Sequence, residues 1–476
     1  MPTVDLAVPP TLPATLSSLP PELLLKILLH ACTTARLSGP LLVHDQFTQL
    51  ETSCRSCVYR NLTGVCKEWR EIVREIMGRE VVLANGCGSE KKDEEVLALI
   101  ATDEGRARNV KVVDAGLRRA TCGWAGWPVP QNTEASGESQ SANVEGGITT
   151  RGVELERIRE QCLNRERQRL YRLLSHCRLV NTLDVDLGFY PALCSPVTLL
   201  PPTIRTLTLR NSEPLETLAL IISLPLLEDL TLRLALDWFL PPSTCPHTSV
   251  GTCRLRRFEL STTAFGATSL PSILALLVNS HETLASLTLR NKGASPAASQ
   301  AFLPVARGLV ETFAEQLEEL TIKDIPRGGR RAPGDEPTSD WFPSRPTSFP
   351  RLAHLHLTGV PLPSPSLFSS SLVLPSPSSH HLRTLTIEDF DALSARPLIE
   401  ALKIVPALRR LEELNVAFAR ELEMQRLGEG VEEGKVWERE KRELEDWCEG
   451  KGREEGRKTA LMASWQVIKV TGCGFW

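Results

Sequence analysis

One pattern of apolar and polar positions recurs along the chain from residue 180 onward. It reads apolar-x-x-apolar-x-apolar, and its last three positions alternate as the two faces of a strand do. Threonine stands inside several copies, as in RTLTLR, EDLTLR, ASLTLR, EELTIK and RTLTIE. Each copy therefore predicts a short strand with one buried face. Nine copies are legible, with apolar residues at Val180, Leu183 and Val185; Ile204, Leu207 and Leu209; Leu227, Leu230 and Leu232; Leu255, Phe258 and Leu260; Leu284, Leu287 and Leu289; Leu317, Leu320 and Ile322; Leu352, Leu355 and Leu357; Leu382, Leu385 and Ile387; and Leu411, Leu414 and Val416.

Helical stripes fill several intervals between these copies. The segments LPSILALLVNS, AFLPVARGLVETFAEQ and RPLIEALKIVPALRR each present apolar residues on one helix face. A single strand and helix would leave their apolar faces uncovered, so neighbouring units must stack to share a core. We therefore expect an α/β leucine-rich-repeat solenoid over residues 153–476, with parallel strands inside and helices outside. Trp465, Ile468 and Val470 suggest a tenth strand.

The repeats are irregular in length. Successive central positions are between 23 and 35 residues apart, against about 20 to 29 in regular families. Two Pro- and Ser-rich insertions, residues 325–350 and 361–381, supply part of the excess, and we expect them to loop out without disturbing the stack. No regular Asn follows the strand, so the hydrogen bonds of an Asn ladder are absent or made by other groups.

Two helical patterns precede the repeats. The first, LPPELLLKILLHA at residues 19–31, has prolines at its first turn and apolar residues around the whole cylinder. Such a helix needs burial on more than one side, which favours contact with another protein. It could instead cap the repeat array, as atypical terminal units do. The second pattern, VCKEWREIVREIM at residues 65–77, is amphipathic in the ordinary way.

These two segments together resemble the F-box, a short helical module, and the rest resembles F-box proteins with irregular, fungal-type leucine-rich repeats. The resemblance implies that the first helix docks on a Skp-type adaptor, which links the chain to a cullin scaffold and a RING subunit. About 30 residues separate the two halves of the motif, so the resemblance requires this insertion to extrude as a loop. By resemblance, the adaptor contact would be made or supported by Leu19, Pro20, Glu22, Leu23, Leu24, Ile27, Leu28, Val65 and Trp69.

The patterns divide the chain into four parts. Residues 1–15 are Pro- and Thr-rich and read as a flexible tail, and residues 16–82 hold the F-box-like helical module with its long insertion at 32–61. Between residues 83 and 152 the regular spacing of apolar residues is lost, which predicts an irregular or disordered linker. The solenoid follows from residue 153.

The strand pattern also predicts a surface. Since the apolar residues point inward, the positions between and beside them emerge on the opposite, concave face. There the sequence is mixed in charge with threonine between, which suits a protein or peptide partner better than a polyanion. The candidate substrate-binding residues are Arg210, Arg233, Arg257, Glu259, Arg290, Glu319, Lys323, His354, His356 and Glu388, and Asp184, Asp186 and Glu413 belong to the same face.

Charge and cysteine usage narrow the partners and the compartment. The formal net charge of −4 and pI near 6.2 argue against nucleic acid as the main partner. The 13 cysteines are scattered and no secretory leader opens the sequence, so we expect a reducing compartment, cytoplasmic and/or nuclear. The longest apolar stretch near the start, 23–31, is interrupted by Lys26 and His30 and is too short to span a membrane.

Catalytic and metal-binding motifs are weak. Cys54 and Cys57, with Cys32, Cys66, His30 and His44 nearby, could supply zinc ligands, but no second tight pair completes the set and buried thiols are common. The segment GEGVEEGKV departs from the phosphate-loop spacing, and no nucleophile elbow or metalloprotease motif is present. We therefore expect no cofactor, no metal and no catalytic residues.

The sequence thus predicts a non-catalytic substrate receptor of a Skp-cullin-F-box type ubiquitin ligase, whose repeats capture a protein substrate. The alternative is a leucine-rich-repeat interaction scaffold without ligase association. The two hypotheses share the solenoid and differ at residues 19–31.

Overall fold

The structure is a computed structural model in which the chain separates into two compact units, Met1–Val180 and Asn181–Trp476. Each unit contains parallel strands. The described residues, apart from a few positions inside these ranges, are 70, 78–83, 90–115, 168–186, 200–211, 221–234, 254–293, 296–324, 341–342, 349–360, 382–389, 396–418, 439–447 and 460–463.

The first unit contains a strand–helix–helix–strand element. Strands β1 (Glu80–Val82) and β2 (Val112–Ala115) pair in parallel, and helices α4 (Glu90–Thr102) and α5 (Glu104–Asn109) connect them. Asp103 caps α5, because its side chain accepts a 3.1 Å hydrogen bond from the backbone N–H two residues into the helix. A parallel pair requires such a crossover connection.

The expectation of an irregular linker over residues 83–152 is therefore wrong for residues 90–115. Val110, Val113 and Ala115 have the same apolar-x-x-apolar-x-apolar spacing as the later repeats, and each is at most 1% exposed. Valine and alanine stand where the later copies carry leucine, so the signal is weaker although the burial is the same. The segment is an additional repeat-like unit.

A helix at residues 168–176 packs against this element through an ion pair. Arg169 Nε donates to Glu94 Oε1 at 3.0 Å, and Arg172 Nη1 contacts Glu94 Oε2 at 3.2 Å. The Arg169 side chain is only 5% exposed. Its hydrogen bond, stronger than the opposing effect of burial, lowers the pKa of Glu94 below the ordinary value.

The second unit is a ten-stranded parallel sheet whose strands follow one another in sequence order, each pairing with the next. Helices α8 (Ser269–Leu277), α9 (Pro296–Phe313) and α11 (Arg396–Ile404) and a 3₁₀ turn, η5 (Val278–Ser280), lie in the connections. The strands are β3 (Thr182–Asp186), β4 (Thr206–Arg210), β5 (Asp229–Leu234), β6 (Arg257–Thr262), β7 (Ser286–Asn291), β8 (Glu319–Asp324), β9 (His354–Thr358), β10 (Thr384–Asp389), β11 (Glu413–Phe418) and β12 (Ala460–Ala463).

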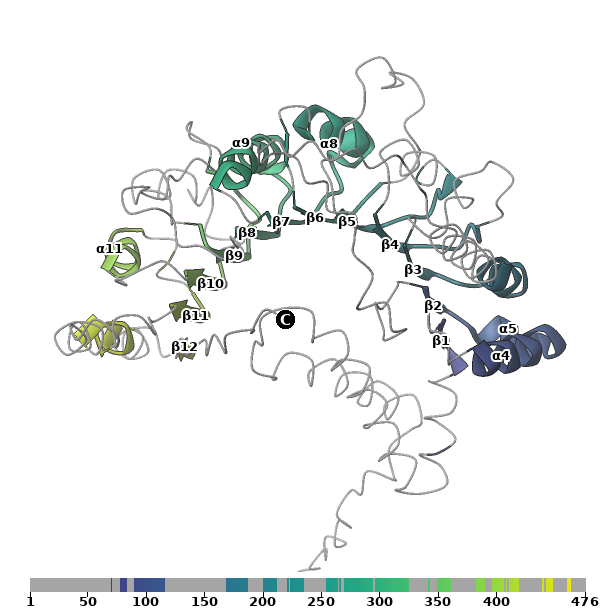
Figure 1. The fold of residues 1–476 in the computed structure, drawn as a ribbon. Coiled ribbons are helices and arrows are strands. Elements are labelled where there is room, and N and C mark those ends of the chain that lie inside the picture. Colours follow the sequence, from purple (N-terminus) through teal and green to yellow (C-terminus); the bar gives the residue numbers. More distant parts are fainter. Residues whose placement is uncertain are drawn as a thin grey trace, which may run out of the picture. The chain divides into compact units, whose positions relative to one another are not determined.

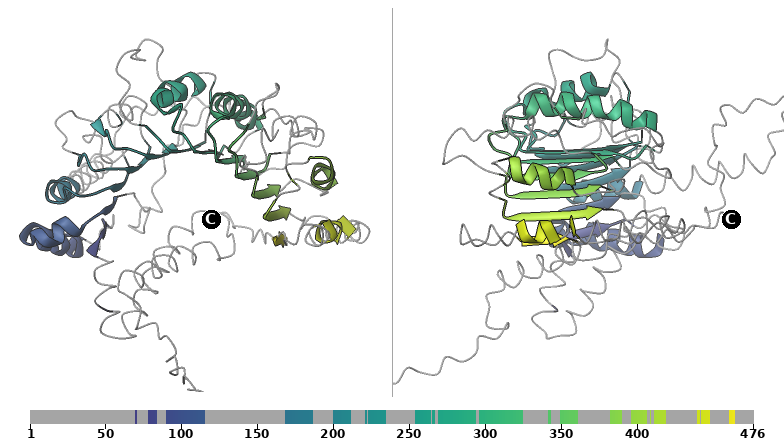
Figure 2. Two further views of the ribbon diagram at one scale, coloured as in Figure 1. Left: turned by 180° about the vertical axis from the view of Figure 1, so that it is seen from behind. Right: turned by 90° about the vertical axis from the view of Figure 1, so that its left-hand side faces the viewer.

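All three helices lie on one side of this sheet (Figures 1 and 2). The apolar residues of the strands point toward them and form the core, as Leu287 and Leu289 show with 0% exposure each. Helix α8 buries Ile273, Leu276 and Leu277 against the same layer. The predicted α/β solenoid with parallel strands and outer helices is confirmed for this unit, and so are the three helical stripes read from the sequence.

Polar side chains at the ends of β7 and β8 hydrogen-bond these two neighbouring strands to each other. Asp324, fully buried, accepts hydrogen bonds at Oδ1 from Asn291 Nδ2 at 2.8 Å and from Ser299 Oγ at 3.0 Å. Asn291 Oδ1 in turn accepts from the backbone N–H of Gly293. Gly359 approaches Asp324 so closely, at a φ of +64°, that a Cβ there would lie 2.0 Å from the Asp324 backbone oxygen. Only glycine fits this position.

Part of the first Pro- and Ser-rich insertion is built into the core. Trp341 is fully buried, and Phe342 and Phe349 are 5% and 4% exposed. The Trp341 and Phe342 rings meet edge to face at a 5.2 Å centroid distance, and Phe342 stacks on Phe349 at 5.9 Å. The expectation that residues 325–350 simply loop out is wrong at these aromatic residues, because their large apolar area is buried with the repeats. Residues 361–381 lie outside the described part of the chain.

Among the described residues, the last strand of the sheet is β12, which places Leu461 beside Leu414 and Ala463 beside Val416. The tenth strand was expected at Trp465, Ile468 and Val470, which are outside the described residues. The pattern ALMA carries only one large aliphatic residue in alternation, so its strand signal was weak.

Candidate functional site

The face of β3–β12 opposite helices α8, α9 and α11 is the candidate site, and we call it the concave face. In each strand the first, third and fifth residues point to this face, as the alternating burial pattern of β4 and β5 shows. The third position is threonine in β4, β5, β7, β8 and β10. These short β-branched residues line the middle of the face and leave charged side chains on both sides of them.

All ten residues predicted to bind substrate lie on this face, and each is partly or fully exposed. The register of the parallel pairs arranges them in three rows. The first positions hold Arg257, Glu319 and His354; the third positions hold Glu259 and His356; the fifth positions hold Arg210, Arg233, Arg290, Lys323 and Glu388.

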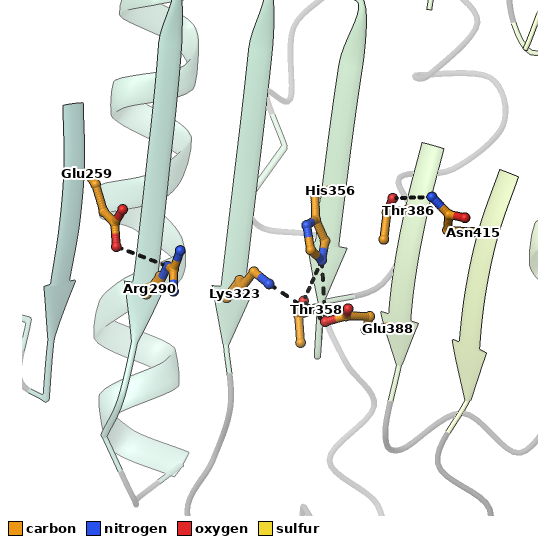
Figure 3. A network of polar contacts seen from close by, with 8 residues as sticks. All are labelled: Glu259, Arg290, Lys323, His356, Thr358, Thr386, Glu388 and Asn415. Carbon is orange, nitrogen blue, oxygen red and sulfur yellow. Dashed lines mark hydrogen bonds and ion pairs between the residues drawn. The ribbon is translucent and has the colours of Figure 1, made fainter. Parts of the chain in front are cut away.

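Three strands bring three polar side chains together around one carboxylate, that of Glu388 (Figure 3). Glu388 Oε2 on β10 accepts a 2.8 Å hydrogen bond from Thr358 Oγ1 and lies 3.3 Å from His356 Nε2, both on β9. Lys323 Nζ on β8 is 3.7 Å from the same oxygen. We call Lys323, His356, Thr358 and Glu388 the Glu388 cluster. It joins neighbouring repeats through side chains as well as through the sheet.

The environment of the Glu388 cluster shifts two pKa values. Burial acts to raise the pKa of Glu388, but the hydrogen bond from His356, the charge of Lys323 and the hydrogen bond from Thr358 outweigh it and lower the pKa to about 2. Burial also lowers the pKa of Lys323, and the attraction of Glu388 opposes this. Glu388 is therefore ionised at neutral pH.

The geometry of the cluster does not fit a hydrolytic triad. In such a triad the carboxylate binds one imidazole nitrogen and the nucleophilic hydroxyl binds the other. Here Glu388 Oε2 and Thr358 Oγ1 both lie 3.3 Å from the same nitrogen, His356 Nε2. The Thr358 hydroxyl moreover donates to the carboxylate. These residues are arranged to hold one another in place on the concave face.

Two ion pairs lie on the strands that precede the Glu388 cluster in the sheet. On β3 and β4, Arg210 donates to both oxygens of Asp184, at 3.0 and 2.7 Å, in a two-point contact. On β6 and β7, Arg290 Nε lies 3.3 Å from Glu259 Oε1 (Figure 3). Both pairs are half-buried, and a protein surface of this kind is ordered before any partner arrives.

Sequence reasoning missed several polar residues on this face. Ser261 and Thr358 occupy fifth positions but are only 2% and 0% exposed, and Asn415, at the third position of β11, donates to Glu413 at 2.9 Å and to Thr386 at 3.3 Å. Strand alternation could have assigned these residues to the concave face, since it applies to uncharged side chains as well.

One expected member of the face is placed differently. Asp186 is only 4% exposed, and its Oδ2 accepts a 2.9 Å hydrogen bond from Asn211 Nδ2. The expectation that Asp186 is exposed as a binding group is wrong, because its side chain is buried. A buried carboxylate needs hydrogen-bond donors, and the Asn211 side chain supplies one from the turn after β4.

The predicted adaptor-binding residues, at positions 19–28, 65 and 69, lie outside the described residues, as do the cysteines considered as zinc ligands. Within the described part of the chain, no group of three or more His, Cys, Asp or Glu side chains could hold a metal ion. Among the helices that the structure describes, none combines the length and the apolar character needed to cross a membrane.

No family model matches the chain, and no curated protein matches it in sequence. The function must therefore be argued from the chain's own residues.

Proposed function

We propose that this chain is a substrate receptor of a Skp-cullin-F-box type ubiquitin ligase. In this proposal the segment 19–31 binds a Skp-type adaptor, and the concave face captures the protein to be modified. The chain itself is not an enzyme and needs no cofactor. It acts by holding one protein near a catalytic assembly that other subunits complete, which is positioning rather than chemistry.

The observation that carries the capture step is the ordered polar surface of the ten parallel strands. Charged residues of both signs stand in register, and several are held by ion pairs such as Asp184–Arg210 and Lys323–Glu388. A preordered surface loses little side-chain entropy on binding. Its mixed charge favours a protein over a nucleic acid, which would require an excess of basic and aromatic groups.

The adaptor step is supported by the sequence of residues 19–31 alone. LPPELLLKILLHA is apolar around most of its helical cylinder, with Glu22, Lys26 and His30 on one narrow stripe, and the second F-box-like segment, VCKEWREIVREIM, follows it. A helix with so wide an apolar surface is stable in water only when other protein surfaces cover it. A Skp-type adaptor would supply such a surface.

The test is co-purification of the full-length chain with a Skp-type adaptor. The double variant Pro20→Ala and Leu24→Ala removes the helix-starting proline and an apolar side chain of the proposed contact. We expect it to lose the adaptor, since truncating a buried apolar anchor at an interface typically costs about 2 kcal/mol or more. The circular dichroism signal of the repeats should be unchanged.

A matched control is the double variant Pro9→Ala and Leu12→Ala, which makes the same two changes in the opening segment. It should retain the adaptor as the unmodified chain does. If the unmodified chain never retains the adaptor, the ligase proposal fails and the scaffold alternative takes its place.

A further inference from the structure

A row of basic residues crosses the concave face at the fifth strand positions. Arg210, Arg233, Arg290 and Lys323 occupy it on β4, β5, β7 and β8, and Ser261 on β6 stands in the middle. Neighbouring positions in such a row are separated by one strand spacing, about 4.8 Å. Like charges this close repel one another unless counter-charges offset them.

Counter-charges are present at both ends of the row. Asp184 binds Arg210 with two hydrogen bonds of 3.0 and 2.7 Å, and Glu388 lies 3.7 Å from Lys323. These ends are electrically balanced by the protein itself.

The middle of the row is balanced only in part. Within the described part of the chain, Arg233 has no ion-pair partner. Arg290 has Glu259 at 3.3 Å from Nε, but that nitrogen is buried and its contact lacks hydrogen-bond alignment. Two guanidinium groups therefore flank Ser261 with unused donor capacity.

Ser261 itself is an independent sign of a missing ligand. It is only 2% exposed, and its hydroxyl makes no hydrogen bond to any residue that the structure describes. Buried hydroxyl groups are nearly always hydrogen-bonded, so one without a partner calls for an explanation. By strand alternation this hydroxyl points to the concave face, between Arg233 and Arg290.

We propose that Arg233, Ser261 and Arg290 form a site for a single oxyanion, a carboxylate or phosphate group carried by the captured protein. The guanidinium groups would each donate to anionic oxygens, and the Ser261 hydroxyl would donate a third hydrogen bond. This inference rests on the proposed capture function of the concave face, because it names what that face recognises.

The surrounding carboxylates limit the ligand to one local anion. Asp184 and Glu388 lie on the same face on either side of the site, and Glu259 lies beside Ser261 on β6, where it pairs with Arg290. A continuous polyanion laid across the strands would meet all three, and like-charge contacts would oppose it. An acidic or phosphorylated residue in an extended peptide places its charge at one point only.

The experiment measures binding of three small probes to the full-length chain by calorimetry: N-acetyl-phosphoserine amide, N-acetyl-glutamate amide and the uncharged N-acetyl-serine amide. We expect at least one anionic probe to bind and the uncharged probe not to bind. The anionic probe that binds more tightly identifies the source of the oxyanion. Arg233→Gln should weaken that probe about tenfold or more, and Ser261→Ala about threefold to tenfold, since each removes a donor to a charged group.

The matched control is Arg205→Gln, which removes an exposed arginine paired with Glu228 outside the row. It should bind the probe as the unmodified chain does. Equal binding by all variants, or an equal loss in Arg205→Gln, would overturn the site. Tighter binding of a single-stranded oligonucleotide than of the single-anion probes would overturn it as well.

Folding and adaptor binding are followed in the same variants. Ser261→Ala should keep the melting temperature, because no hydrogen bond to a described residue is lost. Arg233→Gln should still retain the Skp-type adaptor. Loss of probe binding with the adaptor retained tests the oxyanion site alone, whereas an unmodified chain that binds the probe but never the adaptor contradicts only the ligase proposal.

Discussion

The two faces of the repeat sheet are built from the same strands but differ in residue type and in burial. Toward the helices, side chains such as Leu287, Leu320 and Leu355 align strand after strand and are at most 2% exposed. On the concave face the intervening positions change from arginine to serine to lysine to glutamate along a single row. The apolar layer is uniform because each repeat must cover its neighbour. The polar layer varies because neighbouring repeats do not depend on it for burial, and this variation is why we propose it as the recognition surface.

The largest expected effect comes from breaking the apolar layer. Leu287→Ala should lower the free energy of unfolding by about 3–5 kcal/mol, because it removes a fully buried side chain and leaves a cavity in the middle of the stack. Urea unfolding followed by circular dichroism measures this. The adjacent Thr288→Ala, on the concave face, should cost less than about 1 kcal/mol. Equal losses at the two positions would contradict the difference between the faces.

The same contrast explains what the sequence could predict. Leucines at a fixed spacing, such as Leu317 and Leu320, identify strands because burial leaves no other residue class acceptable there. The alternation then assigns Lys323 and Glu388 to the concave face without further information. Where valine and alanine replace leucine, as at Val113 and Ala115, the same burial left too little signal to recognise.

The sequence pattern could not predict the side-chain contacts between repeats. That Glu388 meets Lys323 from two strands away depends on register and on the lengths of the connections, which vary along the array. The burial of Asp186 depends on Asn211, and the burial of Trp341 on how an irregular insertion folds back. Strand alternation predicts which face a residue occupies but not which neighbours satisfy it.

The second largest loss of stability is expected in the Glu388 cluster, which is the part of the concave face most like a buried core. Glu388→Gln should lower the free energy of unfolding at pH 7 by about 3 kcal/mol, the equivalent of a pKa lowered from 4.5 to about 2 in a side chain that is 13% exposed. Urea midpoints of the two proteins, measured from pH 7 to pH 2.5, test this. The expected loss of unfolding free energy lies at or below the lower end of the range given for Leu287→Ala.

The direction of the Glu388 pKa shift determines how its contribution to stability changes with pH. The pKa of Glu388 is lower in the folded chain than its ordinary value of 4.5, so the stabilisation is fully present above about pH 4.5 and is lost as the pH falls toward 2. The difference between the unmodified chain and Glu388→Gln should therefore shrink over that interval. A difference that stays constant down to pH 2.5 would show that the Glu388 charge does not stabilise the fold.

The smallest effect is expected where a charged pair lies outside both layers. Arg383 and Glu412 form an ion pair of 3.9 Å between the turns before β10 and β11, and their side chains are 51% and 54% exposed. Water screens such a pair, so Arg383→Ala should change the free energy of unfolding by less than about 0.5 kcal/mol. The variant is also the control for Glu388→Gln, because both remove one charge from a pair that joins two repeats. If the two variants lose the same stability, ion pairing between repeats would matter regardless of burial, and the Glu388 cluster would have no special place on the concave face.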